Sequence, residues 1–112
     1  MDLTTGELPL RGDLWWVRAD KRRPAVVIQS DGVREPRTRT FLVVPLTSRQ
    51  HLSGLPGNVR LDRKVTRLSK VSVANVYDVQ KIIVDDMLER LARLPAAEME
   101  LIDDGLRLVL GL

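Results

Sequence analysis

Basic side chains, which can bind phosphate, are concentrated in the middle of this 112-residue chain. Residues 18–70 carry 13 Lys or Arg against 4 Asp or Glu, a net charge of +9, whereas residues 1–17 carry −2 and residues 71–112 carry −4. Guanidinium and ammonium groups at this density are the electrostatic footprint of a nucleic-acid-binding surface. The same arginines could also be solvated loop residues, so charge alone leaves both interpretations open.

Groups that could hold a metal ion or act as a thiol nucleophile are almost missing from the sequence. The chain has no cysteine and one histidine, which excludes disulfides and thiol catalysis and argues against a zinc site. That histidine, His51, titrates near neutral pH, but it follows Arg49 and Gln50 in a polar segment, which favours nucleic-acid contact or plain exposure over catalysis. The Gly54–Gly57 segment lacks the lysine and helix of a nucleotide-binding loop. We expect neither a metal nor a cofactor.

Short runs rich in β-branched residues, separated by turn residues, predict the elements that must position these side chains. The six predicted strands are residues 14–17, 25–28, 41–44, 59–61, 71–77 and 81–84. In residues 71–77 apolar side chains alternate with small ones up to Tyr77, as in a half-buried strand. Short strands at this spacing suggest a small barrel or sandwich.

The end of the sequence changes to a helical period. Asp85 or Asp86 could cap a short helical turn through residues 87–88. Further on, Pro95 suits a helix start, and apolar side chains recur at helical spacing until Gly111. We therefore expect a mainly β protein (α+β) with one C-terminal helix packed on the sheet.

Length and composition fit one ordinary globular domain. The chain is 44% hydrophobic and 29% charged, enough for one modest core. No apolar run approaches the roughly 20 residues that span a bilayer. Residues 1–10 carry two acidic side chains and lack the basic start of a signal peptide. We expect a cytoplasmic protein with an N-terminal extension, residues 1–10, before one domain, residues 11–112.

Five blocks of sequence follow one another along the chain. They are Arg11-Gly12-Asp13-Leu14-Trp15, Arg22-Arg23-Pro24-Ala25-Val26-Val27, Val44-Pro45-Leu46-Thr47-Ser48, the strand pair between Val59 and Ile83, and Leu91-Ala92-Arg93-Leu94 before the terminal helix. Together they resemble the MazF/PemK toxin family, over nearly everything after residue 10. The segments Ile28-Gln29-Ser30-Asp31 and Leu55-Pro56-Gly57-Asn58-Val59 look closest to mycobacterial-type members.

The resemblance implies a small SH3-like β-barrel of the PemK/CcdB type and the activity of a type II toxin. That activity is sequence-specific, metal-independent endoribonuclease cleavage of single-stranded RNA (mRNA, rRNA or tRNA), which inhibits translation and growth. The resemblance also implies a homodimer and a cognate MazE-like antitoxin, whose acidic, flexible C-terminal segment competes with RNA for one groove.

The resemblance carries the family's catalytic arginine to Arg23 and its catalytic threonine to Thr47, with Ser48 beside it. Asp78 falls where some members place an acid proposed as the base. Without metal, the ribose 2′-hydroxyl must attack its own phosphate, and an arginine fork can neutralise the phosphorane without giving up its proton. Each residue could instead have only a structural role. The Arg23 side chain could cover a sheet edge, the Thr47 hydroxyl could hydrogen-bond the backbone of a turn, and Asp78 could form an ion pair with Lys81.

The predicted RNA contacts are polar and aromatic residues around these positions. They are Trp16, Arg18, Lys21, Arg22, Ser48, Arg49, Gln50, His51 and Lys81. Trp15 and Trp16 are adjacent on a predicted strand and point to opposite faces, so one belongs to the core and the other to the surface. A surface Trp16 could stack on a base or pack at the dimer interface.

Two departures from the family pattern bear on activity. Residues 18–22 are shorter than the loop that most members carry between their first two strands, and Val79 stands where many have glutamine. Two other hypotheses stay open. A CcdB-like toxin that binds DNA gyrase would not need Arg23 and Thr47 together, and a non-catalytic nucleic-acid-binding barrel would keep the basic surface without cutting RNA. Product formation separates the ribonuclease from both.

Overall fold

The computed structural model describes residues 8–33 and 37–112, so most of the predicted extension, residues 1–10, lies outside the described residues. Its strands are β1 (Asp13–Arg18), β2 (Arg22–Val27), β3 (Thr40–Thr47), β4 (Val59–Leu61), β5 (Ser72–Ala74), β6 (Gln80–Ile83) and β7 (Met87–Arg93). Its helices are α1 (Arg63–Thr66) and α2 (Ala96–Leu110), with short 3-10 helices η2 (Gln50–Gly54) and η3 (Val84–Asp86). None of the described helices is long and apolar enough to cross a membrane.

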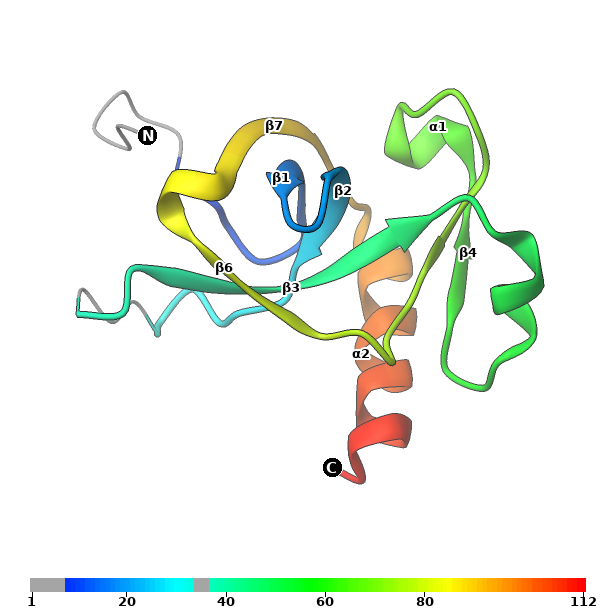
Figure 1. Ribbon diagram of the computed structural model, residues 1–112. Helices are drawn as coiled ribbons and strands as arrows, with labels where there is room; N and C mark the ends of the chain where they lie inside the picture. The colour runs from blue at the N-terminus through cyan, green and yellow to red at the C-terminus, as the bar shows by residue number, and fades with distance from the viewer. Residues whose placement is uncertain (1–7, 34–36) are drawn as a thin grey trace.

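The described strands pair into one antiparallel sheet in the order β4-β5-β3-β2-β1-β7. The long strand β3 pairs with β2 along one edge, and with β6 and then β5 along the other. The sheet curls, so that β7 arches over β1 and β2 (Figure 1). Pairing among the described residues leaves it open rather than closed as a barrel. The predicted class, a mainly β protein with a C-terminal helix, is confirmed.

The two faces of the sheet carry two hydrophobic cores. The first, between the sheet and α2, contains Leu14, Val26, Val44, Leu46, Val59, Leu61, Ala74, Val76, Ala92, Leu94, Met99, Ile102 and Leu106. The second, on the other face, contains Trp15, Val17, Ala25, Val27, Phe41, Val43, Ile82, Val84 and Met87. Neighbouring strand residues point to opposite faces, so Leu14 enters the first core and Trp15 the second. A slip of one residue would exchange the faces, and the two cores therefore fix the strand register.

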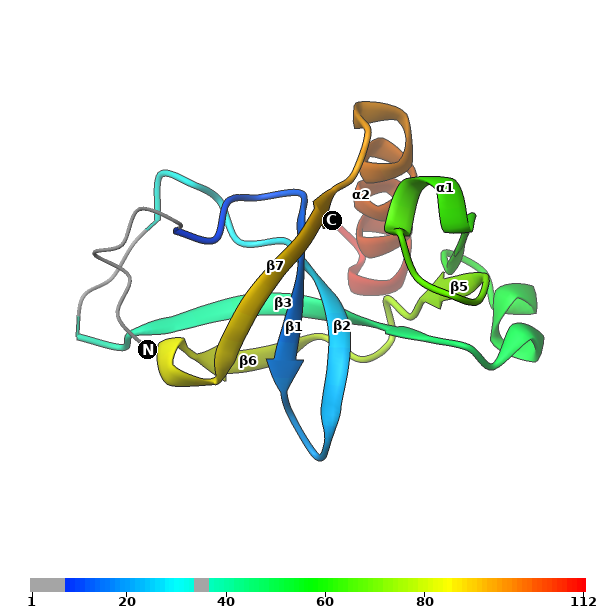
Figure 2. The same ribbon diagram turned by 90° about the horizontal axis from the view of Figure 1, so that it is seen from above.

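Helix α2 packs against the first core and contacts β4, away from the turn of the β1–β2 hairpin (Figure 2). It ends as predicted at Gly111, whose φ of +72° is left-handed. A Cβ on Gly105 would lie 2.9 Å from the carbonyl carbon of Gly57, so glycine lets the helix approach the chain before β4. Arg11 ties the helix to the start of β1, because its Nη1 donates to Oδ2 of Asp103 at 3.0 Å.

The strand predicted over residues 71–77 is wrong in its extent. Only β5 is a strand, and all three of its residues are buried because it lies between β3 and β4. The chain then turns, with the backbone N–H of Asp78 donating to the carbonyl of Asn75 at 3.1 Å. Tyr77 lies in this turn and is 49% exposed, so the predicted alternation stops before it.

The helical turn predicted after Asp85 or Asp86 is also wrong. Those residues end η3, and Met87 begins β7, which pairs with β1. The sequence of β7, Met-Leu-Glu-Arg-Leu-Ala-Arg, consists of good helix formers. Pairing with β1 and burial of Met87 in the second core override that local preference.

Candidate active site

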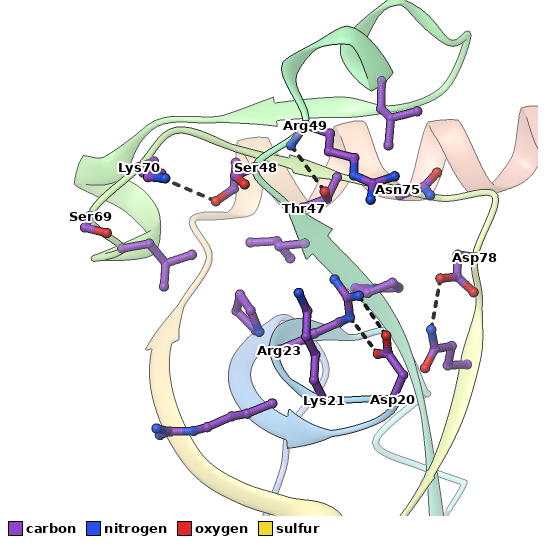
Figure 3. A pocket seen from close by; sticks show the side chains of 18 residues that line it. Asp20, Lys21, Arg23, Thr47, Ser48, Arg49, Ser69, Lys70, Asn75 and Asp78 are labelled. Atoms are coloured by element: carbon purple, nitrogen blue, oxygen red, sulfur yellow. Dashed lines mark hydrogen bonds and ion pairs between the residues drawn. The ribbon is translucent and has the colours of Figure 1, made fainter.

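A groove of about 600 Å³ opens where the start of β2, the end of β3 and the turn before β6 meet. Its basic side chains are Lys21, Arg22, Arg23, Arg49 and Lys70, and its acidic ones are Asp20 and Asp78. Five positive charges against two negative ones give the groove a net positive charge. Figure 3 shows Arg23 and Asp20 facing Thr47 across it, with Asn75 and Asp78 along one side.

The sheet register brings Arg23 and Thr47 together although they are distant in the sequence. Strands β2 and β3 are antiparallel, with Ala25 opposite Pro45. Extending this register by two residues sets Arg23 opposite Thr47. Residues opposite each other in a sheet point to the same face, and both side chains line the groove.

The guanidinium of Arg23 is held by Asp20, at the tip of the β1–β2 hairpin. Its Nε donates to Oδ1 of Asp20 at 2.8 Å and its Nη2 donates to Oδ2 at 2.9 Å. These bonds raise the pKa of Arg23 above its ordinary value, with a smaller contribution from the charge of Asp78. They also hold the pKa of Asp20 well below its usual range. Arg23 therefore stays cationic, which suits stabilisation of phosphate charge rather than proton donation.

Thr47 presents its hydroxyl at the end of β3. Its Oγ1 accepts a hydrogen bond from the backbone N–H of Arg49 at 3.2 Å. This turn bond uses an oxygen lone pair and leaves the hydroxyl hydrogen available to donate. The turn-bonding role predicted as an alternative for Thr47 is therefore present and compatible with a phosphate contact.

Asp78 lies in the turn between β5 and β6. Its Oδ2 accepts a hydrogen bond from Nε2 of Gln80 at 2.9 Å, rather than from the Lys81 ammonium expected in the plainer alternative. Gln80 lines the groove and Lys81 does not, because neighbouring residues on β6 point to opposite faces. The carboxylate is exposed and close enough to influence the pKa of Arg23.

These three side chains supply complementary chemistry within one groove. Arg23 can bind a phosphate oxygen, Thr47 can donate a hydrogen bond, and Asp78 can accept a proton. Among residues 8–33 and 37–112, no group of three His, Cys, Asp or Glu could hold a metal ion.

A family model described as a PemK-like, MazF-like toxin of type II toxin–antitoxin systems matches residues 10–110. This chain belongs to that family. Endoribonuclease MazF6 of Mycobacterium tuberculosis is 36% identical over 110 residues, which cover 91% of this chain and 96% of the relative. Endoribonuclease MazF2 of Mycobacterium bovis shows the same identity and coverage. The predicted resemblance to mycobacterial MazF proteins is confirmed.

Solved structures show the same fold. The Mycobacterium tuberculosis toxin MazF-mt6 superposes with a TM-score of 0.78 at 25% identity, covering 89% of this chain and 97% of the toxin. A MazE-MazF structure from Deinococcus radiodurans superposes with a TM-score of 0.75 at 27% identity, covering 95% of this chain and 99% of the matched chain.

The predicted RNA contacts of this MazF-family chain divide into two groups. Lys21, Arg22, Ser48 and Arg49 line the groove. Trp16, Arg18, Gln50, His51 and Lys81 do not line it. Gln50 has a local structural role, because its Nε2 donates to the carbonyl of Val71 at 2.8 Å and so ties η2 to the chain before β5.

The two tryptophans divide between core and surface as predicted. Trp15 is 1% exposed, whereas Trp16 is half-buried. The guanidinium carbon of Arg22 lies 4.6 Å from the ring centroid of Trp16, and Nη2 of Arg22 donates to Oε1 of Glu89 at 2.7 Å. The Trp16 ring is thus covered by a cation, and an RNA base stacking there would have to displace Arg22.

Several groove residues of this MazF-family chain were not predicted. The polar ones are Asp20, Ser69, Lys70, Ser72, Asn75 and Gln80. Asp20 could have been found from the sequence, since the carboxylate of an acidic residue at a hairpin tip can reach an arginine three residues later. The others come from β5, β6 and the connections around them, whose path past β3 has no local sequence signal.

Proposed function

We propose that this MazF-family protein is a toxin that cleaves single-stranded RNA at a defined sequence and without a metal ion. Endoribonuclease is the enzyme class of its curated MazF relatives. The observation that supports this activity best is the placement of Arg23 and Thr47 in one basic groove by the β2–β3 register. Metal-free cleavage needs a fixed cation and a hydrogen-bond donor at the same phosphate.

The nucleophile in this reaction is the RNA itself. The 2′-oxygen forms a bond to the adjacent phosphorus, the bond to the 5′-oxygen breaks, and the products carry a 2′,3′-cyclic phosphate and a 5′-hydroxyl. Asp78 takes the proton of the 2′-hydroxyl, and the leaving 5′-oxygen takes a proton from water. Arg23 binds the phosphate oxygens, and its contribution grows as negative charge builds in the phosphorane.

Thr47 donates its hydroxyl hydrogen to a second phosphate oxygen, while its turn bond to Arg49 holds the oxygen in place. Around this centre, Lys21, Arg22, Ser48 and Arg49 bind the RNA backbone in the groove. Trp16, Arg18, Gln50, His51 and Lys81 extend the RNA contacts beyond it. Because mRNA, rRNA and tRNA are cytoplasmic substrates, we place the toxin in the cytoplasm, where cutting them stops translation and growth.

The partners are a second copy of the chain and a MazE-type antitoxin. The Deinococcus radiodurans MazE-MazF structure supports the antitoxin assignment, since its matched chain shares the fold and 27% identity with this one. An acidic antitoxin segment has the charge to occupy the net positive groove in place of RNA. The protein acts as a homodimer, with RNA lying across the two copies.

The test is cleavage of long single-stranded RNA in EDTA by the purified protein, with product ends mapped by sequencing. We expect discrete cuts with 5′-hydroxyl ends, lost in Arg23→Ala and in Thr47→Ala. Arg107→Ala is the matched control, because Arg107 pairs with an aspartate three residues away on α2, outside the groove. Thr47→Ser keeps the hydroxyl and should keep measurable cleavage.

Two results would overturn the ribonuclease hypothesis. Gyrase inhibition without RNA products would favour the CcdB-like hypothesis. RNA binding without products, from folded protein freed of antitoxin, would favour the non-catalytic barrel.

A further inference from the structure

Asn75 is a groove residue held in place by its own backbone. Its N–H donates to the carbonyl of Pro45 at 3.1 Å, and its carbonyl accepts from the N–H of Asp78 at 3.1 Å. These bonds fix it between the strand that carries Thr47 and the turn that carries Asp78. Its half-buried side chain therefore has a defined position beside both proposed catalytic residues (Figure 3).

The neighbouring amide of Asn58 can adopt only one orientation. Its Oδ1 accepts from the backbone N–H of Val76 at 2.8 Å, and its Nδ2 donates to the carbonyl of Leu52 at 3.0 Å. A backbone N–H only donates and a carbonyl only accepts, so reversing this amide would break both bonds. The same Nδ2 also donates to Oδ1 of Asn75 at 3.2 Å.

Asn58 in turn decides which end of the Asn75 amide faces the groove. The Oδ1 of Asn75 accepts two hydrogen bonds, from Nδ2 of Asn58 and from the backbone N–H of Tyr77 at 3.3 Å. If the Asn75 amide were reversed, its NH₂ group would face the Asn58 NH₂ group and the Tyr77 N–H, which are both donors. Asn75 therefore turns its oxygen toward the protein, and its NH₂ group has no partner in the part of the chain that the structure describes. The groove receives two N–H donors and no acceptor from this residue.

We propose that Asn75 recognises a base of the RNA by donating from its side-chain NH₂ group to O4 of uracil or O6 of guanine, which favours these bases over cytosine and adenine. The proposal rests on the proposed ribonuclease function and assigns part of its sequence specificity. An asparagine that reads adenine uses its oxygen and its NH₂ together, and here the oxygen is already occupied. At the position where uracil and guanine carry an oxygen, cytosine and adenine carry an amino group, which would meet the NH₂ donor to donor.

A purely structural role for Asn75, as the acceptor that holds the Tyr77 turn, can be separated from base recognition by Asn75→Asp. One carboxylate oxygen of aspartate can accept the two bonds that Oδ1 now accepts. The second oxygen replaces the NH₂ group and can only accept. The variant therefore keeps the contacts that support the turn and reverses the hydrogen-bonding polarity presented to RNA.

The experiment compares cleavage sites on an RNA pool with randomised positions for the wild type, Asn75→Asp and Asn75→Ala. Glu100→Ala, an exposed change on α2, is the surface control. For the wild type we expect one position of the motif to prefer a keto base by roughly 2- to 12-fold, the net value of one hydrogen bond. Asn75→Asp should shift that position toward an amino base, Asn75→Ala should make it indifferent, and the rest of the motif should not change. Thermal unfolding of each variant checks the fold.

Each other outcome has a definite meaning. A motif that is unchanged in Asn75→Asp, with all sites cut more slowly by the same factor, would overturn base recognition and place Asn75 on the phosphate backbone. Amino bases at every wild-type position would also overturn it. If the wild type cuts no RNA while binding it, the proposed function fails, and this assignment fails with it. If the wild type cuts RNA and both Asn75 variants keep its motif, the ribonuclease function stands and only the proposed role of Asn75 fails.

Discussion

Asp20 and Arg23 face each other through two parallel hydrogen bonds, Nε to Oδ1 at 2.8 Å and Nη2 to Oδ2 at 2.9 Å. The carboxylate uses the Nε side of the guanidinium. The two hydrogens on Nη1 and the second hydrogen on Nη2 stay available for a phosphate. Asp20 therefore fixes the plane of the guanidinium without using all of its donors, and this sets expectations for both residues.

Replacing Arg23 by lysine should lower the RNA cleavage rate by roughly 100-fold or more while leaving the fold intact. A lysine keeps the positive charge but loses the planar fork that contacts two oxygens at once. Single-turnover cleavage of a mapped site measures the effect. Arg107→Lys changes the same residue type outside the groove and should cut at the wild-type rate. Wild-type activity in Arg23→Lys would mean that charge alone is enough.

Asp20→Asn should lower the cleavage rate roughly tenfold, because a guanidinium that is no longer clamped is less often in the productive geometry. The unfolding temperature should change by a few degrees at most, since exposed ion pairs stabilise little. Asp104→Asn is the matched control, because Asp104 and Arg107 form another exposed pair three residues apart. A faster Asp20→Asn enzyme would show instead that Asp20 competes with the phosphate.

The carboxyl group of Asp20 should titrate well below its ordinary pKa of 3.8, because the bonds from Arg23 stabilise the charged form. A carboxyl pKa that is lowered by folding contributes stability above the ordinary pKa, and that stability is lost as the pH falls through the folded value. The pair therefore stays charged from neutral pH down through the ordinary carboxyl pKa of 3.8. Carbon NMR of the Asp20 carboxyl checks this, and in Arg23→Ala the midpoint should rise toward 3.8. An unchanged midpoint would contradict the ion pair.

Gly105→Ala should destabilise the protein by about 1–3 kcal/mol or more, because the added Cβ would meet the backbone of Gly57 and push α2 off the sheet. Denaturant unfolding measures the change. Gly54→Ala is the control, since a Cβ there meets nothing within 4 Å. Equal stability of the two variants would mean that the backbone at Gly57, before β4, can shift away from the added Cβ at little cost.

The pattern of apolar residues was enough to predict most elements. Alternation placed Trp15 and Trp16 on opposite faces, and the helical period with Gly111 predicted the end of α2, because these signals depend on neighbours in sequence. The pattern failed for β7. Its residues prefer a helix in isolation, and only the distant strand β1 makes them a strand.

By itself the sequence determined which side chains this protein can use: the basic middle segment, Arg23, Thr47, and, through its family blocks, the chemistry they imply. The tertiary structure alone decided their arrangement. The β2–β3 register sets Arg23 and Thr47 in one groove, and Asn75 turns its NH₂ group to the groove because Asn58 holds its oxygen. The physical reason is that side-chain type is local, whereas register and hydrogen-bond polarity are fixed by partners distant in the sequence.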